Sequence, residues 1–122
     1  MGTFYINCKV ENHTDRKKSI QIAKLLVDTG SEYTWIPAEK LEKIGVNREK
    51  KDVPFIMANG ELVTRNLGFA ILRVDGHFTI DEVVFAEKGD LALLGARMLE
   101  GFNLTVDSAR KKLVAAGPLP AA

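Results

Sequence analysis

Two stretches near the start of the chain have the residue pattern of β-strands. Over residues 4–10 apolar side chains occupy every second position, which is typical of a strand with one buried face. Residues 20–27 alternate at first and end in the continuous apolar run Leu25-Leu26-Val27, so we expect that end to be buried on both faces. Asn12-His13-Thr14-Asp15 between them is typical of a turn, because Asn and Asp side chains hydrogen-bond to nearby backbone. We therefore expect His13 to be exposed to solvent.

The next pattern predicts a short helix. Pro37 suits the first turn of a helix, Ala38, Leu41 and Ile44 then fall on one face, and Gly45 follows as a C-terminal cap. The intervening residues are mostly charged, as on a solvent-exposed helix face.

Two β-hairpins are predicted in the middle of the chain. Asn59-Gly60 is a pair preferred in tight hairpin turns, and it separates two stretches of strand character. Asp75-Gly76 is a second such pair, and His77 beside it is expected to be exposed. The four strands are expected at residues 53–58, 61–64, 69–74 and 78–86.

The last third of the chain predicts short strands and one more helical turn. The expected elements are a buried strand at 91–94, a helical turn at 96–100 closed by Gly101, and strands at 103–106 and 112–115. The whole is mainly β, with roughly eight short strands and two small helices. The order strand, glycine, helix, glycine, strand occurs over residues 25–46 and again over 91–102, which indicates two internal half-repeats.

The composition is that of one globular domain. The chain has 122 residues, of which 46% are apolar, and this length is typical of a single domain. We expect a core over residues 3–115 and a flexible tail at 116–122, whose prolines cannot pair within a sheet. The 17 basic and 16 acidic side chains give a net charge of +1, which argues against nucleic acid as a partner. Basic clusters at residues 16–18, 50–51 and 110–112 are predicted to lie in exposed turns.

Neither a metal, a cofactor nor a membrane is indicated. Cys8 is the single cysteine, and with His13 and His77 it gives no zinc-ligand spacing, so we expect a buried strand residue. No apolar run approaches the roughly 20 residues that cross a bilayer, and the N-terminus has no signal-peptide pattern. We therefore expect a cytoplasmic protein without a disulfide, a cofactor or a membrane partner.

One segment stands out chemically. Asp28-Thr29-Gly30-Ser31 follows the strand end that we expect to be buried on both faces. A carboxylate there needs hydrogen-bond donors or a shared proton, because burial disfavours the charged form. Backbone amides of the turn and the hydroxyls of Thr29 and Ser31 are possible donors. The tripeptide alone is a weak signal, and an ordinary strand-ending turn is the alternative interpretation.

The surrounding residues extend this motif to a family resemblance. Residues 28–37, with Trp35-Ile36-Pro37 at their end, closely resemble the active-site motif of aspartic proteases. Leu93-Leu94-Gly95 resembles the second motif of that family, and residues 56–62 lie where the family carries its flap hairpin. Over residues 18–115 the chain resembles small bacterial and archaeal retropepsin-like proteases. The resemblance implies a mainly β lobe over residues 1–122, a closed β-barrel with one or two short helices and a flap hairpin.

The resemblance also implies a reaction. Aspartic proteases use two carboxylates that share one proton across a bound water, without a covalent intermediate. The chain carries one Asp-Thr-Gly, so the second carboxylate would be Asp28 of a second copy related by a twofold axis. The expected protein is a homodimeric aspartic endopeptidase that acts on peptides or proteins.

Roles follow from the resemblance residue by residue. Asp28 would be catalytic, Thr29 would reach across the twofold axis, and Gly30 would leave room for the turn. Ser31 would add a donor to the carboxylates and lower the pH optimum. The residues implied to contact substrate are Trp35, Leu94 and the flap residues Met57, Ala58, Asn59 and Gly60.

The chain departs from the family pattern at three places, and the first two of these, together with the balanced charge, keep an alternative open. The flap has no tyrosine, since Tyr5 and Tyr33 are the only two, and Ala96 stands where retroviral enzymes carry arginine, with Arg97 one residue later. The proline-containing tail cannot copy the interleaved terminal strands of retroviral dimers. The alternative is a non-catalytic homodimeric module of the same fold that binds peptides or protein partners.

Overall fold

The computed structural model describes residues 3–121, and this part of the chain is mainly β, as predicted. The strands are β1 (Tyr5–Asn12), β2 (Ser19–Val27), β3 (Thr34–Pro37), β4 (Lys50–Ile56), β5 (Leu62–Val74), β6 (His77–Ala86), β7 (Leu93–Leu94), β8 (Leu104–Asp107) and β9 (Lys112–Ala115). The helices are α1 (Ala38–Lys43) and α2 (Ala96–Phe102). Among the residues that the structure describes, no helix is long and apolar enough to cross a membrane.

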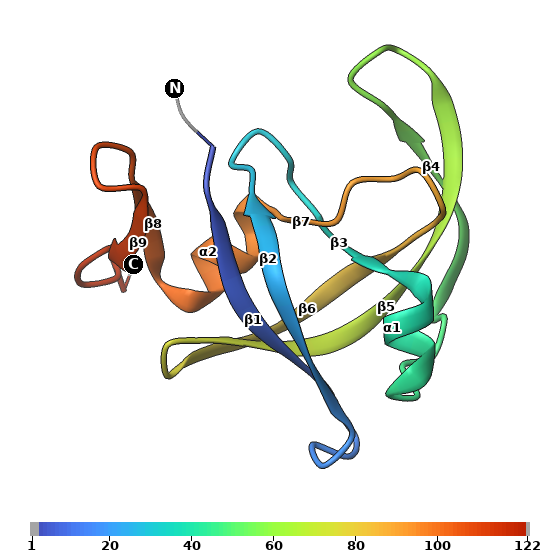
Figure 1. The fold of residues 1–122 in the computed structure, drawn as a ribbon, viewed down its shortest axis with the longest axis horizontal. Coiled ribbons are helices and arrows are strands. Elements are labelled where there is room, and N and C mark those ends of the chain that lie inside the picture. The colour runs from blue at the N-terminus through green and yellow to red at the C-terminus, as the bar shows by residue number, and fades with distance from the viewer. Residues whose placement is uncertain (1–2, 122) are drawn as a thin grey trace.

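Seven strands form one sheet that closes on itself. Its order is β1-β2-β7-β3-β6-β5-β4, and β1 also pairs with β5, so six strands form a ring with β4 outside it. The short strand β7 lies between β2, to which it is parallel, and β3, to which it is antiparallel. Strands β8 and β9 form a separate hairpin, which lies on the far side of the molecule from β4 (Figure 1). The ring is the closed barrel that the resemblance implies.

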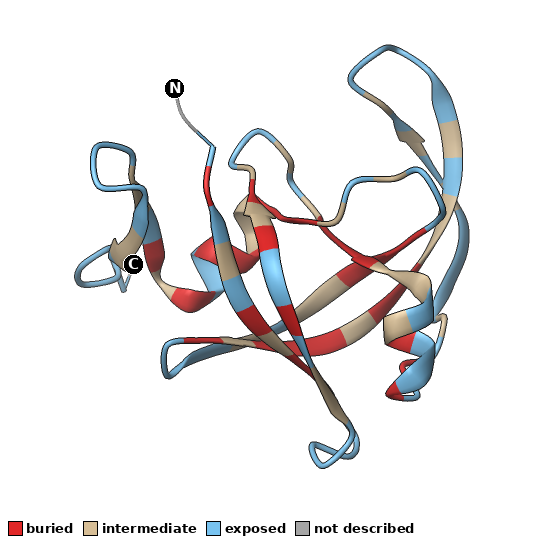
Figure 2. Ribbon diagram, in the orientation of Figure 1, coloured by how far each residue is buried: buried red, intermediate tan, exposed pale blue. Residues whose placement is uncertain are grey.

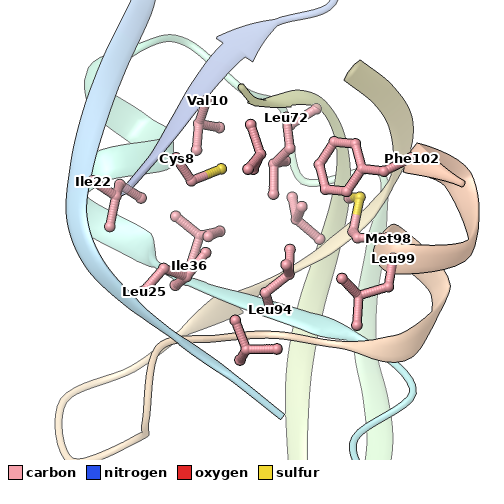
Figure 3. Packing of buried hydrophobic residues seen from close by; sticks show 14 of the residues in the cluster. Cys8, Val10, Ile22, Leu25, Ile36, Leu72, Leu94, Met98, Leu99 and Phe102 are labelled. Carbon is pink, nitrogen blue, oxygen red and sulfur yellow. The ribbon is translucent and has the colours of Figure 1, made fainter. Parts of the chain in front are cut away.

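The interior of the ring is filled by apolar side chains from every strand around it. Leu25, Ile36, Leu72 and Leu94 are fully buried there, and Met98 of α2 packs against them (Figure 3). Cys8 lies in the same core with 1% of its surface exposed, as predicted, and burial raises the pKa of its thiol to about 12. Buried residues follow the strands of the barrel, whereas the hairpin tips are exposed (Figure 2).

A second, smaller apolar cluster lies outside the ring, and β4 packs against it. Trp35, Leu67, Val84, Ala86 and Leu93 are buried in it. Tyr33, Phe55 and Met57 pack against the cluster and remain partly exposed, so they form the floor and wall of an open site.

Several element boundaries differ from the prediction. β5 is one strand of 13 residues, because Gly68 does not break it but lets the backbone of Asn47 approach, where any side chain would overlap. α2 continues through Gly101 to Phe102 and ends with Asn103 in the left-handed conformation (φ 57°). The predicted helix cap at Gly45 and the predicted hairpin turn at Gly76 are confirmed by positive φ values at both glycines.

Three surface predictions had different outcomes. His13 is half-buried against Phe69, with ring centroids 6.3 Å apart, rather than exposed. His77 is exposed, as predicted. Lys50 and Lys51 begin β4 instead of forming a turn, and the Lys50 ammonium lies 2.8 Å from a Glu82 carboxylate oxygen.

Candidate active site

Asp28 directly follows β2, and its backbone is held from both sides. The amide of Asp28 donates to the carbonyl of Leu94 (3.0 Å), and the amide of Val27 donates to that of Phe4 (3.0 Å). The chain then turns, because the amide of Ser31 donates to the Asp28 carbonyl (3.2 Å) and the amide of Gly30 donates to the carboxylate oxygen Oδ1 (3.0 Å). The half-buried carboxylate is therefore oriented by a backbone donor of its own turn.

The start of α2 is hydrogen-bonded to this turn. The amides of Ala96 and Arg97 donate to the carbonyls of Ser31 (2.7 Å) and Glu32 (3.1 Å). A side chain at Gly95 would overlap the Tyr33 carbonyl and lie 2.9 Å from that of Glu32. The glycine of Leu93-Leu94-Gly95 is therefore required by the close approach of the two motifs.

Thr34 joins the same two motifs, and the sequence analysis did not single it out. Its hydroxyl oxygen accepts a hydrogen bond from the Gly95 amide (2.9 Å), and the side chain is buried. The available signal was a polar residue next to Trp35 and Ile36, in the middle of an apolar stretch.

A cavity of about 660 Å³ opens beside Asp28. It lies between the loop after β2, the hairpin of β4 and β5, and the loop before β7, which Figure 1 shows at one end of the barrel. This volume is within the usual range of ligand sites. Its lining comprises Asp28, Gly30, Ser31, Glu32, Tyr33, Trp35, Phe55, Ile56, Met57, Ala58, Gly89, Asp90, Leu91 and Leu93.

The cavity brings together six of the ten residues predicted for the site, namely Asp28, Gly30, Ser31, Trp35, Met57 and Ala58. Thr29 is exposed and lines a neighbouring hollow of about 120 Å³ instead. Asn59 and Gly60 form the tip of the hairpin, outside the lining. Trp35 is both a packing and a lining residue, because 8% of its surface remains exposed.

Leu94 is a correction. Its side chain is fully buried in the core, so it cannot contact a ligand in the cavity. Successive side chains of a strand point to opposite faces, and it is Leu93 that lines the cavity.

Ser31 is a second correction. Its hydroxyl donates to the carbonyl of Tyr33 (3.0 Å) and not to the Asp28 carboxylate. The structure therefore gives no support to the expectation that this hydroxyl lowers the pH optimum.

The hairpin over the cavity is anchored just below its tip. Phe55 of β4 makes edge-to-face contacts with Tyr33 and Trp35, with ring centroids 5.6 and 5.3 Å apart. At the tip, the Met57 amide donates to the Glu61 carbonyl (2.8 Å). The tip itself is exposed, and so is the apolar side chain of Ile56 at 78%.

Two other carboxylates line the cavity with Asp28. Glu32 is exposed at the rim, whereas Asp90 accepts hydrogen bonds from the Arg65 guanidinium, which holds its pKa below the usual range. Among residues 3–121, no three His, Cys, Asp or Glu side chains are grouped as a metal site would require.

A comparison with known families assigns the sequence to one of them. The family model described as "gag-polyprotein putative aspartyl protease" matches residues 17–101, well over half of the chain. The chain belongs to this aspartyl protease family. The matched range contains the Asp28 turn, the hairpin and Leu93-Leu94-Gly95, and it leaves out β1 and the β8–β9 hairpin. No curated protein matches the sequence of this family member.

Proposed function

We propose that the protein is an aspartic endopeptidase that acts as a homodimer, with Asp28 of each copy in one shared active site. The observation that carries this proposal is the position of the Asp28 turn, which lies at a largely apolar cavity covered by a hairpin in a chain of the aspartyl protease family.

The reaction needs two carboxylates that share one proton. The ionised carboxylate takes a proton from a water molecule, whose oxygen forms a bond to the carbonyl carbon of the peptide, while the protonated partner gives its proton to the carbonyl oxygen. The C–N bond then breaks as the amine takes a proton from the carboxyl pair and one hydroxyl of the tetrahedral intermediate returns a proton to it, which restores the shared proton. The Gly30 amide donates a hydrogen bond to Oδ1 (3.0 Å) and so orients the Asp28 carboxylate.

A second copy is the best source of the second carboxylate. Asp90 is engaged by Arg65, and Glu32 lies at the solvent-exposed rim, so neither is placed to share a proton with Asp28. Thr29 and Gly30 are exposed beside the carboxylate, which leaves this turn accessible to the same turn of a partner.

The cavity favours an extended peptide with a large apolar side chain. Tyr33, Trp35, Phe55, Met57 and Leu93 present apolar surface to it. Closure of the hairpin over such a peptide would exclude water other than the reacting molecule.

The test is a digest of a proteome-derived peptide library from about pH 3.5 to 7, read by mass spectrometry. Wild type and the Asp28→Asn variant are compared at high protein concentration. Asn has almost the same shape but cannot act as a base, so we expect cuts with wild type only. Equal cutting by both proteins would overturn the proposal.

The non-catalytic module is the second candidate. The observation that favours it concerns Arg97, which is next to the position where retroviral enzymes carry arginine. Arg97 lies 2.8 Å from Asp81 and 5.0 Å from the centre of the Tyr33 ring, so both of these contacts are made within its own chain. If a folded wild-type dimer cleaves nothing but binds library peptides, this second function is supported in place of the first.

A further inference from the structure

One ion pair joins two walls of the cavity. Arg65 lies on β5, the returning strand of the hairpin, and Asp90 lies in the loop between β6 and β7. The guanidinium donates through Nε to Oδ2 (2.7 Å) and through Nη2 to Oδ1 (2.9 Å), so both carboxylate oxygens are engaged. Such paired, charge-assisted hydrogen bonds fix direction as well as distance.

The pair is shielded from solvent and further constrained by neighbouring backbone. The Arg65 and Asp90 side chains are only 13% and 8% exposed. Arg65 Nη1 also donates to the Thr64 carbonyl (2.7 Å), and the Glu87 amide donates to Asp90 Oδ2 (2.8 Å). Both side chains are therefore held in one orientation by several bonds at once.

The loop held by this pair is part of the cavity. Gly89, Asp90 and Leu91 line it, and the Leu91 side chain is 68% exposed. The turn between residues 87 and 90 is closed by the Asp90 amide, which donates to the Glu87 carbonyl (2.9 Å). Arg65 therefore reaches the loop through Asp90, whose side chain also closes the turn, and Nη1 of Arg65 lies 3.7 Å from Oε1 of Glu87.

The hairpin held by this pair is the cover of the cavity. Arg65 lies opposite Val53 in the register of β4 and β5, close to Phe55, which packs on Trp35. The ion pair and this aromatic contact hold the two strands close to the tip of the hairpin. Beyond them the tip hydrogen bonds join residues 57–61 to one another.

We propose that Arg65 and Asp90 are positioning residues that set the separation between the hairpin and the loop before β7, and with it the width of the apolar cavity. The consequence for peptide binding rests on the proposed function, whereas the consequence for hairpin motion does not. Weakening the pair widens the cavity, so a peptide is held less tightly although Asp28 is untouched.

The test uses two substitutions singly and together, Arg65→Lys and Asp90→Asn. Lysine keeps the positive charge but cannot form the paired contact. The control is Arg73→Lys, because Arg73 also lies on β5 and its Nε lies 2.8 Å from Glu11, a pair outside the cavity lining. Thermal unfolding of each variant establishes that it is folded.

The first measurement needs no activity. We expect hydrogen exchange of the amides in residues 56–62 to accelerate by about tenfold in both cavity variants and to stay unchanged in Arg73→Lys. Trp35, the single tryptophan, reports the same change through its fluorescence, because it contacts Phe55 of the hairpin.

The second measurement is the kinetics of peptide cleavage. We expect KM to rise by about tenfold, with kcat changed less than about threefold, because the carboxylates that react are untouched. The double variant should be no worse than the worse single variant, since both remove the same contact.

The outcomes separate this proposal from the proposed function. Unchanged exchange and fluorescence in folded variants would overturn the positioning role, whatever the kinetics. A higher KM in Asp90→Asn but not in Arg65→Lys would also overturn it, because Asp90 would then act on the peptide directly. Faster exchange in the two cavity variants, together with no peptide cleavage by wild type, would support the positioning pair and overturn the protease instead.

Discussion

The backbone around Asp28 is fixed by residues from distant parts of the chain. Its hydrogen-bond partners include the carbonyl of Leu94, and the preceding residue is bonded to Phe4. Gly95 and Thr34 then join the two motifs through a buried hydrogen bond. The carboxylate therefore depends on backbone geometry that no single segment provides.

Gly95 is the residue at which this geometry is most easily broken. We expect Gly95→Ala to lower the free energy of unfolding by about 3 kcal/mol, because the methyl group overlaps the Tyr33 carbonyl and forces the two motifs apart. Urea denaturation measures the change. The control is Gly76→Ala, where no atom lies within 4 Å and only the left-handed φ of 82° opposes a side chain, at about 1 kcal/mol. Equal losses for the two variants would contradict the overlap.

Ser31 gives a prediction about pH that differs from the family expectation. We expect Ser31→Ala to lower the free energy of unfolding by about 1 kcal/mol, because the Tyr33 carbonyl loses a donor. The pH profile of peptide cleavage should stay where it is, since the hydroxyl does not contact the carboxylate. A profile shifted to higher pH, measured beside wild type on one peptide, would show that Ser31 acts on Asp28 after all.

At the scale of elements, local patterns predicted most strands but not their lengths. The hairpin around Asn59-Gly60 and the buried end of β2 follow from turn chemistry and apolar alternation. β5 could not be predicted as one strand, because the reason for Gly68 is the passing backbone of Asn47, a contact between segments far apart in sequence. A glycine that breaks a strand and one that makes room look alike in sequence.

The site was predicted as far as its motifs, and the exceptions have a common cause. Whether Leu93 or Leu94 faces the cavity depends on which strands lie on either side of β7, and that is a property of the assembled sheet. Arg65 and Asp90 are 25 residues apart in ordinary polar segments, so their contact has no local pattern.

The Arg65–Asp90 ion pair links β5 to the loop before β7, and its contribution to the stability of the fold depends on pH. Arg65 lowers the folded-state pKa of Asp90, so the stabilisation is complete above the ordinary aspartate pKa of about 3.9 and is lost only as the pH falls through the lower, folded value. Glu87 and Glu61 are the other charged groups near Arg65.

We therefore expect Asp90→Asn to be less stable than wild type by about 1–3 kcal/mol at pH 7 and at pH 5 alike. Below about pH 4 the difference should shrink, because wild type then loses the same charge. Denaturant titrations of both proteins from pH 7 down to 2.5 measure it. A difference that already shrinks between pH 7 and 5 would contradict the lowered pKa.

At the scale of the whole molecule, the site is open on one side. The smaller hollow of about 120 Å³ beside Asp28 is lined by Phe4, Val27 and Thr29 from one end of the chain and by Val106 of β8 from the other. Phe4 and Val106 lie outside the range that matches the aspartyl protease family. Part of the surface next to the carboxylate therefore comes from residues outside the matched range.

A mixing experiment decides whether two copies share one site. Wild type and Asp28→Asn are mixed in equal amounts at a concentration low enough for subunits to exchange, and are then concentrated. If each active site needs Asp28 from both copies, random pairing leaves only about a quarter of the dimers active. If each chain worked alone, half of the total activity would remain.

Asp75→Asn serves as the control partner, because Asp75 lies in an exposed turn whose left-handed φ of 48° asparagine also adopts. Mixing with that variant should leave activity unchanged, so a loss to about a quarter with Asp28→Asn alone would assign the second carboxylate to the partner.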